Sequence, residues 1–226
     1  MELSPVAEDY LKAIYHLEAE NGRPVRTVDI SDEVGVTSPT VSNMIDTLDE
    51  RELVDYTPYK GVALTDCGEA VVLRLVRHHR LLETFLMEHL DYSWSEVHDE
   101  ADRLEHYVSE EFVSRLETFL GEPRMDPHGD PIPDAKLQMP EASPHTPLTE
   151  FEVGDVVTVE QVPHRDPDVR EFLSSRDIGP GTRLTVDAVS PVGLVTVEPS
   201  HGEESIALPT HVARRIGARL TDPPQD

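Results

Sequence analysis

The spacing of apolar residues changes at a proline-rich stretch, and this change limits the fold more than any other feature of the chain. Before it, apolar side chains recur every three to four residues, as in amphipathic helices. Between residues 127 and 147, seven proline and glycine residues interrupt any long regular element. After it, apolar and polar residues alternate in short runs such as 156–159 and 194–197. The chain is therefore predicted to be mainly α, with a small β-barrel at its C-terminal end.

The first 65 residues predict three helices followed by a β-hairpin. Ser4 and Pro5 form a helix start, with Ser as the cap and Pro at the first helical position. Ser38 and Pro39 repeat this pattern before the third helix. The predicted elements are helices at 5–20, 27–34 and 40–53 and strands at 53–56 and 62–65. This is the element order of a winged helix-turn-helix.

A helix-turn-helix places its second helix in the major groove, with the N-terminal residues of that helix against the bases. Here those positions carry small, hydrogen-bonding side chains, and the wing would lie on the DNA backbone. The candidate DNA-binding residues are Arg26, Ser38, Pro39, Thr40, Ser42, Asn43, Tyr59 and Lys60. The alternative is a winged helix that makes a protein contact or a dimer interface.

The chain is strongly acidic: 45 Asp and Glu residues face 19 Lys and Arg, a formal charge of −26. Only three of the basic residues are lysines, and the acids are spread along the whole chain. This pattern is typical of halophilic proteins, which work in molar salt. Residues 1–64 hold five basic and thirteen acidic side chains, so we expect weak phosphate neutralisation and salt-tolerant DNA binding. A nucleic-acid mimic is the alternative explanation.

Two absences in the sequence bear on where the protein works. No stretch approaches the roughly 18 apolar residues of a membrane span, and the acidic start lacks the basic region of a signal peptide. The single cysteine, Cys67, excludes an intrachain disulfide and a Cys-cluster zinc site. A cytoplasmic protein with no membrane partner is expected.

Metal-ligand side chains are concentrated on two further predicted helices, at 67–90 and 95–110. Within each helix their spacing of three or four residues puts them on one face. The set comprises His79, Glu83, His98, Asp102, Glu105 and His106. Nitrogen and oxygen donors without thiolate suit Mn²⁺ or Fe²⁺, with Zn²⁺ as a competitor. Taken singly, each acid has an alternative role as a surface charge and each histidine as a structural residue.

Four segments resemble the diphtheria toxin repressor family of iron- and manganese-dependent transcriptional regulators. They are EDYLKAIY at 8–15, HRLLE at 79–83, VHDEADRLEH at 97–106 and PHGDPIP at 127–133. The similarity continues more weakly into the C-terminal part, which is similar to the SH3-like, ferrous-transport-A-like module of the longer members. The resemblance implies a non-enzymatic repressor that binds double-stranded operator DNA as a homodimer, with a metal ion as co-repressor.

The resemblance also implies which residues hold the metal. The primary site would take Asp9, Asp102, Glu105 and His106, and the ancillary site His79, Glu83 and His98. The C-terminal module offers Asp166 and Asp168, with His164 nearby, as further ligands. Because Asp9 belongs to the first helix, metal would tie the DNA-reading domain to the central helices and shift it toward the spacing of an operator.

Departures from the family pattern favour Mn²⁺, with Fe²⁺ as the second choice. Iron-responsive members have Met and Cys where this chain has Asp9 and Asp102, which gives them a softer site. Manganese-responsive members have carboxylates at both positions, but they add another carboxylate where this chain has Lys12. Lys12 therefore argues against a paired-manganese arrangement.

The predicted domains are a winged helix-turn-helix at 1–66, a helical metal-binding and dimerisation domain at 67–139, a Pro-rich linker at 140–147 and an SH3-like domain at 148–222. Apolar residues of the central helices exceed what one small core needs, so they predict a dimer interface; their alternative role is an intrachain core. They are Leu86, Met87, Leu90, Leu104, Tyr107, Val108, Phe112 and Leu116. Two other functions stay open: a regulator that senses a non-metal ligand, and a metal-dependent hydrolase.

Overall fold

The structure is a computed structural model that describes residues 3–140, 145–163, 165–190, 192–200 and 205–221. Part of the predicted linker, 141–144, lies outside these residues, as does His164. The chain divides into two compact units. The first unit is Met1–His79, Arg103–Ser114 and Pro133–Gln138; the second is Arg80–Asp102, Arg115–Ile132 and Met139–Asp226.

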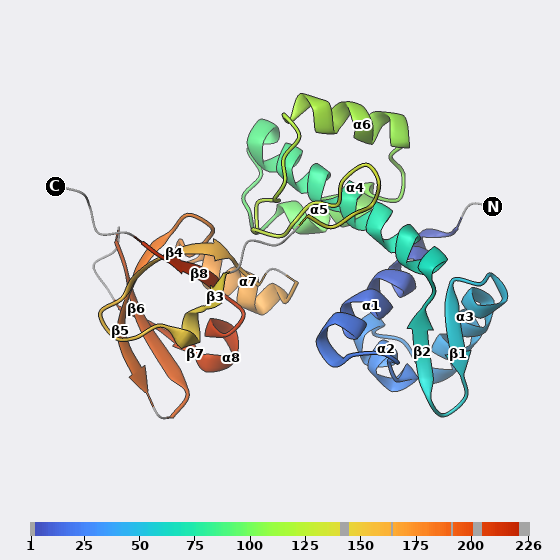
Figure 1. The fold of residues 1–226 in the computed structure, drawn as a ribbon, viewed down its shortest axis with the longest axis horizontal. Coiled ribbons are helices and arrows are strands. Elements are labelled where there is room, and N and C mark those ends of the chain that lie inside the picture. Colours follow the sequence, from blue (N-terminus) through green and yellow to red (C-terminus); the bar gives the residue numbers. More distant parts are fainter. Residues whose placement is uncertain (1–2, 141–144, 164, 191, 201–204, 222–226) are drawn as a thin grey trace. The chain divides into compact units, whose positions relative to one another are not determined.

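The N-terminal part of the first unit has the predicted three helices and hairpin (Figure 1). These elements are α1 (Pro5–Asn21), α2 (Thr27–Val34), α3 (Ser38–Glu50), β1 (Val54–Thr57) and β2 (Gly61–Leu64). The two strands are antiparallel, with Val54 opposite Leu64. A single apolar core joins the helices to the hairpin through fully buried side chains such as Leu11, Ile14 and Ile45. The helical periodicity therefore located this core correctly.

The ends of α3 differ slightly from the prediction. Thr37, not Ser38, is the N-cap, and its side chain makes no capping hydrogen bond. The helix ends at Glu50 instead of Leu53, because Glu52 adopts a positive φ of 59° and turns the chain. The Leu53 amide then donates to the Leu48 carbonyl, which closes the helix as in a Schellman motif.

Three helices form the middle of the chain: α4 (Asp66–Leu90), α5 (Val97–Leu104) and α6 (Glu110–Phe119). The prediction of one helix from 95 to 110 is wrong, because α5 ends at Leu104. The Tyr107 amide donates to the Leu104 carbonyl in a turn, and the Ser109 hydroxyl accepts from Phe112 at the start of α6. Glu105 and His106 therefore lie in a turn, where helical spacing does not determine their directions.

The C-terminal part is a six-stranded antiparallel sheet in the order β3-β8-β4-β5-β6-β7. Its elements are β3 (Thr146–Pro147), η1 (Leu148–Glu150), β4 (Val156–Gln161), α7 (Pro167–Ser174), β5 (Arg183–Ser190), β6 (Leu194–Pro199), β7 (Ile206–Pro209), α8 (Thr210–Ala213) and β8 (Gly217–Leu220). Alternate residues of β4, β5 and β6 fill its core, as the two-residue periodicity predicts. Within the described residues β3 and β7 remain edge strands, so the predicted closed barrel is not observed.

Helix α7 and the two strands at one side of the sheet, β3 and β8, were not predicted. Strands β3 and β8 are two and four residues long, too short to show a period of two. No helix among the described residues is long and apolar enough to cross a membrane.

Candidate metal centre

Asp9, Glu105 and His106 come together within the first unit. One donor atom from each lies within 4.8 Å of the other two. The His106 Nε2 atom is 3.1 Å from Asp9 Oδ1 and 3.7 Å from Glu105 Oε1. Asp9 lies on α1 beside the buried Tyr10, so the helix core holds its backbone while its carboxylate stays at the surface. Two carboxylates and an imidazole at this separation fit a divalent transition-metal ion.

Glu8 orients His106, a role that the sequence analysis missed. The His106 Nδ1 atom lies 2.7 Å from Glu8 Oε2, which leaves Nε2 directed at Asp9 and Glu105. Arg74 contacts the other oxygen of Glu8 at 3.4 Å. Histidines that bind metals usually donate their second ring N–H to a carboxylate in this way. The only available signal was a second acid beside Asp9, which is weak in so acidic a chain.

Glu105 is almost fully buried and lies against Lys12 and His79. The Lys12 Nζ atom lies 2.9 Å from each of its oxygens, and His79 Nδ1 lies 2.6 Å from Oε2. The positive charge of Lys12 and the imidazole of His79 therefore offset the free-energy cost of burying the Glu105 carboxylate.

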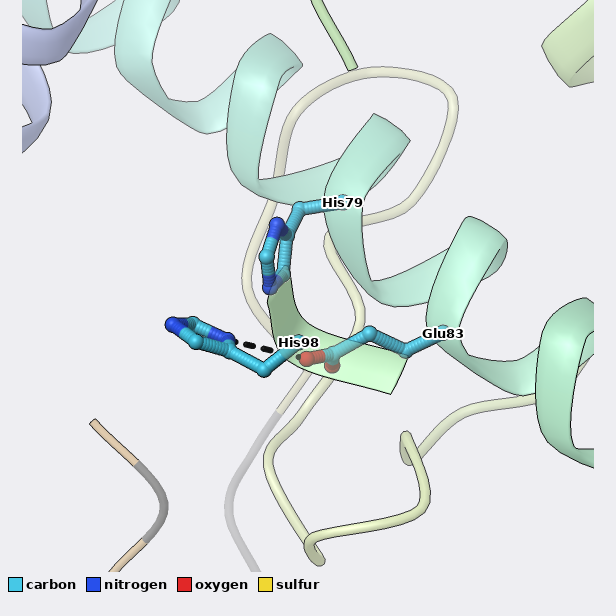
Figure 2. A group of neighbouring side chains, drawn as sticks. All are labelled: His79, Glu83 and His98. Carbon is cyan, nitrogen blue, oxygen red and sulfur yellow. Dashed lines mark hydrogen bonds and ion pairs between the residues drawn. The ribbon is translucent and has the colours of Figure 1, made fainter. Parts of the chain in front are cut away.

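The predicted ancillary residues His79, Glu83 and His98 also lie close together. His79 and Glu83 are one turn apart on α4, and His98, in the first turn of α5, faces Glu83 (Figure 2). The His98 Nδ1 atom is 3.1 Å from Glu83 Oε1. One donor atom from each of the three falls within 4.8 Å of the others.

A buried group of Glu83, Asp126 and His128 was not predicted as a site. His128 Nε2 donates to the Trp94 carbonyl at 2.8 Å, and its Nδ1 lies 3.4 Å from Glu83 Oε2. Burial, together with the charges of Glu83 and Asp130, raises the pKa of Asp126 to about 7. The signal in the sequence was a histidine, His128, between two acids, Asp126 and Asp130. Glu83 thus belongs to two candidate ligand groups.

Asp102 is not part of the Asp9, Glu105 and His106 group. Its side chain is half exposed, and its Oδ2 atom lies 3.8 Å from His98 Nε2. A carboxylate oxygen of Asp102 belongs instead to a group with His79 and Glu105. The predicted four-residue primary set is therefore divided between two overlapping groups.

Asp166 and Asp168, the acids of the C-terminal module that were predicted as metal ligands, lie outside the candidate metal groups of the described residues. Asp166 is the N-cap of α7, and its carboxylate accepts from the Asp168 and Val169 amides. Both Asp166 and Asp168 are exposed, and neither joins a candidate metal group among the described residues.

The candidate DNA-binding residues are exposed at the start of α3 and at the wing. The residues concerned are Ser38, Pro39, Thr40 and Asn43 at the helix start and Tyr59 and Lys60 in the turn between β1 and β2. Ser42 is half-buried, and its hydroxyl donates back to the Ser38 carbonyl. Arg26 forms a two-point ion pair with Asp29, at 2.8 and 2.5 Å, and its hydrogen bonds lower the pKa of that carboxyl. Arg26 therefore brings little net positive charge to this surface.

Comparison with known families accounts for nearly the whole chain. The model of the iron dependent repressor N-terminal DNA binding domain matches residues 2–62, that of the iron dependent repressor metal binding and dimerisation domain matches 65–134, and that of the FeoA domain matches 146–220. These matches and the folds above confirm the predicted fold class, apart from barrel closure.

Individual relatives cover similar lengths. The iron-dependent repressor IdeR of Mycobacterium tuberculosis is 32% identical, over 95% of this chain and 97% of its own. The diphtheria toxin repressor of Corynebacterium glutamicum is 28% identical, over 95% and 96%. A solved manganese-dependent transcriptional repressor in complex with manganese is 38% identical, covers 95% of this chain and 100% of its own, and has a TM-score of 0.81.

Proposed function

Because this chain belongs to the iron-dependent repressor family, we propose that it represses transcription by binding operator DNA as a homodimer, with a divalent metal ion as co-repressor. The observation that carries the proposal is the meeting of Asp9, from the DNA-reading part, with Glu105 and His106. The three modules would be the predicted domains, 1–66, 67–139 and 148–222, and the protein would act in the cytoplasm, where its DNA is.

We propose Mn²⁺ as the physiological ion, with Fe²⁺ second. The group of Asp9, Glu105 and His106 contains carboxylate oxygens and one imidazole, with no sulfur donor. Such sets of donors suit the harder Mn²⁺. The structural relative at 38% identity is described as manganese-dependent, whereas the mycobacterial relative is described as iron-dependent. His79, Glu83 and His98 would form the ancillary site.

The chain's own residues connect the metal group to the DNA reader. Asp9 precedes Tyr10 and Leu11, and both of these are buried in the same core as Ile45 and Leu48 of α3. A bound ion would supply the positive charge that offsets the facing carboxylates of Asp9 and Glu105. Movement of Asp9 toward Glu105 would then carry α1, and with it α3, because a packed core transmits such shifts as one body.

Metal removal tests the proposal directly. Duplex DNA would be selected from a random pool by the full-length protein in Mn²⁺, and binding would then be measured by fluorescence anisotropy. We expect chelation to lower affinity at least about tenfold, since metal shifts a two-state equilibrium toward the binding form. Adding Mn²⁺ back should restore it, and Asp9→Ala should abolish the response.

Asp187→Ala is the matched control, because Asp187 is an exposed acid of β5 that joins no candidate metal group among the described residues. It should respond to Mn²⁺ like the natural chain. DNA binding that ignores chelation would instead support a regulator of a non-metal ligand, and hydrolysis of a phosphate or peptide substrate by Mn²⁺-loaded protein would support an enzyme.

A further inference from the structure

The β-hairpin of the DNA-binding part is joined to the end of α1 by a buried carboxylate. Glu18 lies in the last turn of α1, and its side chain is only 4% exposed. Its Oε1 atom accepts a hydrogen bond of 2.8 Å from the Leu64 amide of β2, which is 46 positions away in the sequence. A carboxylate is costly to bury beside a core of apolar side chains, so this hydrogen bond is a specific connection between the helix and the strand.

Contacts of the segment that follows α1 strengthen the same connection. The Val25 and Val62 backbones exchange two hydrogen bonds of 2.8 Å, which pair β2 with this segment. A Cβ atom built on Gly61 would clash with the Val25 carbonyl oxygen, so the strand can approach this closely only with glycine there. Arg23, in the same segment, lies 2.7 Å from Glu18 Oε2 and offsets its charge. The outer edge of β2 is therefore held by the end of α1 and the residues after it.

A second carboxylate joins the other strand of the hairpin to α3. The Asp49 Oδ1 atom of α3 accepts a hydrogen bond of 2.9 Å from the Tyr56 amide of β1. Tyr56 is the partner of Val62 in the register of the two strands. The hairpin lies between the two helices, bonded to α1 through β2 and to α3 through β1 (Figure 1). Both helices therefore determine the direction of the wing, which is the turn between β1 and β2.

Glu18 and the candidate metal ligand Asp9 belong to the same helix. They are nine residues apart, which is two and a half turns and about 13 Å along the axis, so they lie on opposite sides of α1. Asp9 faces His106, and Glu18 faces β2. Because a helix packed in a core moves as a rigid body, a shift of Asp9 toward a metal ion would also move the Glu18 end of the helix.

We propose that Glu18 is a positioning residue that carries the metal-driven movement of α1 to the wing, so that the wing and the start of α3 reach the DNA together. The inference rests on the proposed metal-dependent function and adds the wing to the movement described for α3. It gives Glu18 a role in the affinity for DNA and none in the affinity for the metal ion. Because these two affinities can be measured separately, the inference can fail while the proposed function stands.

The test is to replace Glu18 in the full-length protein, and to measure Mn²⁺ affinity by calorimetry and DNA affinity in saturating Mn²⁺ by fluorescence anisotropy. Glu18→Ala should lower DNA affinity about tenfold, the change expected when one hydrogen bond to a charged group is lost, and should leave Mn²⁺ affinity unchanged. Glu18→Gln should keep most of the DNA affinity, since its amide oxygen can still accept from Leu64. Glu20→Ala is the control, because Glu20 is an exposed acid at the same end of α1, and it should match the natural chain in both measurements.

A double-mutant cycle distinguishes an effect through the wing from a general loss of stability. Glu18→Ala should lower DNA affinity about tenfold in the natural chain, but by no more than about twofold in a Tyr59→Ala and Lys60→Ala background, where the wing has lost its side chains for DNA. Equal losses in the two backgrounds would overturn the proposal. So would a folded Glu18→Ala variant that binds DNA as tightly as the natural chain.

Should Glu18→Ala fail to fold, amide hydrogen exchange of the natural chain decides. The Leu64 amide should exchange slowly, and equally with and without Mn²⁺, because α1 and the wing keep their contact as they move. Fast exchange at Leu64, or exchange that changes with Mn²⁺, would contradict a fixed connection. A natural chain whose DNA binding ignores chelation would instead count against the proposed function itself.

Discussion

At the scale of single residues, Gly129 shows how tightly the segment beside the buried Glu83, Asp126 and His128 group is held. Its φ is +88°, and a Cβ atom built on it would lie 1.9 Å from the Glu160 carbonyl oxygen. The neighbouring backbone is itself fixed, since the Val162 amide donates to the His128 carbonyl. The C-terminal sheet therefore helps to position this group through backbone contacts.

Gly129→Ala should lower the free energy of unfolding by about 3 kcal/mol, because the clash is with backbone and cannot be relieved by a side-chain rotation. Gly181 has the same φ of +88° with nothing within 4 Å of its Cβ position. Gly181→Ala should therefore cost only the conformational strain, about 1 kcal/mol. Denaturant unfolding of both variants measures the difference, and equal losses would contradict the role given to the Glu160 contact.

Asp126 makes the stability of the metal-free protein depend on pH. Its pKa is raised to about 7 by burial and by neighbouring acids, whereas an unfolded aspartate titrates near about 3.9. Between about pH 4 and pH 7, Asp126 therefore keeps a proton in the folded state that it has lost in the unfolded state. Stability from this group is complete below about pH 4 and is lost as pH rises through 7, at up to about 1.4 kcal/mol per unit.

Asp126→Asn isolates this contribution, because an amide oxygen can still accept from the His128 and Asp130 amides as Oδ1 does now. Unfolding would be measured in chelator from pH 4.5 to 8 for both proteins. Relative to the natural chain, the variant should gain stability steadily as pH rises. Two parallel curves would show that Asp126 is ionised in the folded protein throughout.

At the scale of elements, helices α1 and α3 of the DNA-binding part differ in what holds their N-terminal ends. The Ser4 side chain accepts from the Ala7 amide at the start of α1, whereas Thr37, at the start of α3, makes no capping hydrogen bond and pairs with the Thr40 hydroxyl. The start of α1 is therefore held by its own cap. The start of α3 depends on packing, and its hydroxyl groups remain at the surface predicted to meet DNA.

Ser4→Ala should lower the free energy of unfolding by about 1 kcal/mol, since it removes a helix N-cap. Thr37→Ala should cost less than Ser4→Ala, because no amide of the helix loses a partner. Thermal unfolding of the two variants in the same buffer provides the comparison. A larger loss for Thr37→Ala would mean that the start of α3 carries more of the stability than its hydrogen bonds indicate.

At the scale of the whole molecule, the formal charge of −26 limits how strongly the protein can attract DNA, because DNA is negatively charged too. Arg26 is paired with Asp29 and Arg23 with Glu18 and Glu69, so few basic groups remain to neutralise phosphates. We therefore expect the DNA affinity to come mainly from base contacts and buried area. Such contributions are far less sensitive to salt than phosphate neutralisation.

The logarithm of DNA affinity should therefore fall with the logarithm of salt with a slope no steeper than about −3, whereas six phosphate contacts would give about −5. Anisotropy titrations from 0.2 to about 1 M KCl in Mn²⁺ measure it. Asp55→Lys, on the exposed face of β1, should steepen the slope by about one if the wing lies on the backbone. A steep slope for the natural protein would contradict this account.

The sequence by itself determined the local elements, because their signals involve neighbouring residues. The cap and proline of α1, the apolar spacing of α2 and α3 and the alternation in β4, β5 and β6 each act over a few positions. Each of these elements is present, although the ends of α3 differ from the prediction. The quoted segments were also enough to identify the family. Spacing alone could set the geometry of only two pairs of the predicted ligands, each pair on one helix: His79 with Glu83 on α4, and His98 with Asp102 on α5.

The tertiary structure alone decided how the ligand groups are composed. Once α5 ended at Leu104, the directions of Glu105 and His106 depended on the turn that follows and on partners from α1 and α4. Glu8 and Lys12 entered the cluster through pairs 98 and 93 residues apart in sequence, and Asp126 joined Glu83 only where the chain doubles back. Such pairings are set by packing and by the need to neutralise buried charge, which depend on contacts across the fold and leave no local pattern in the sequence.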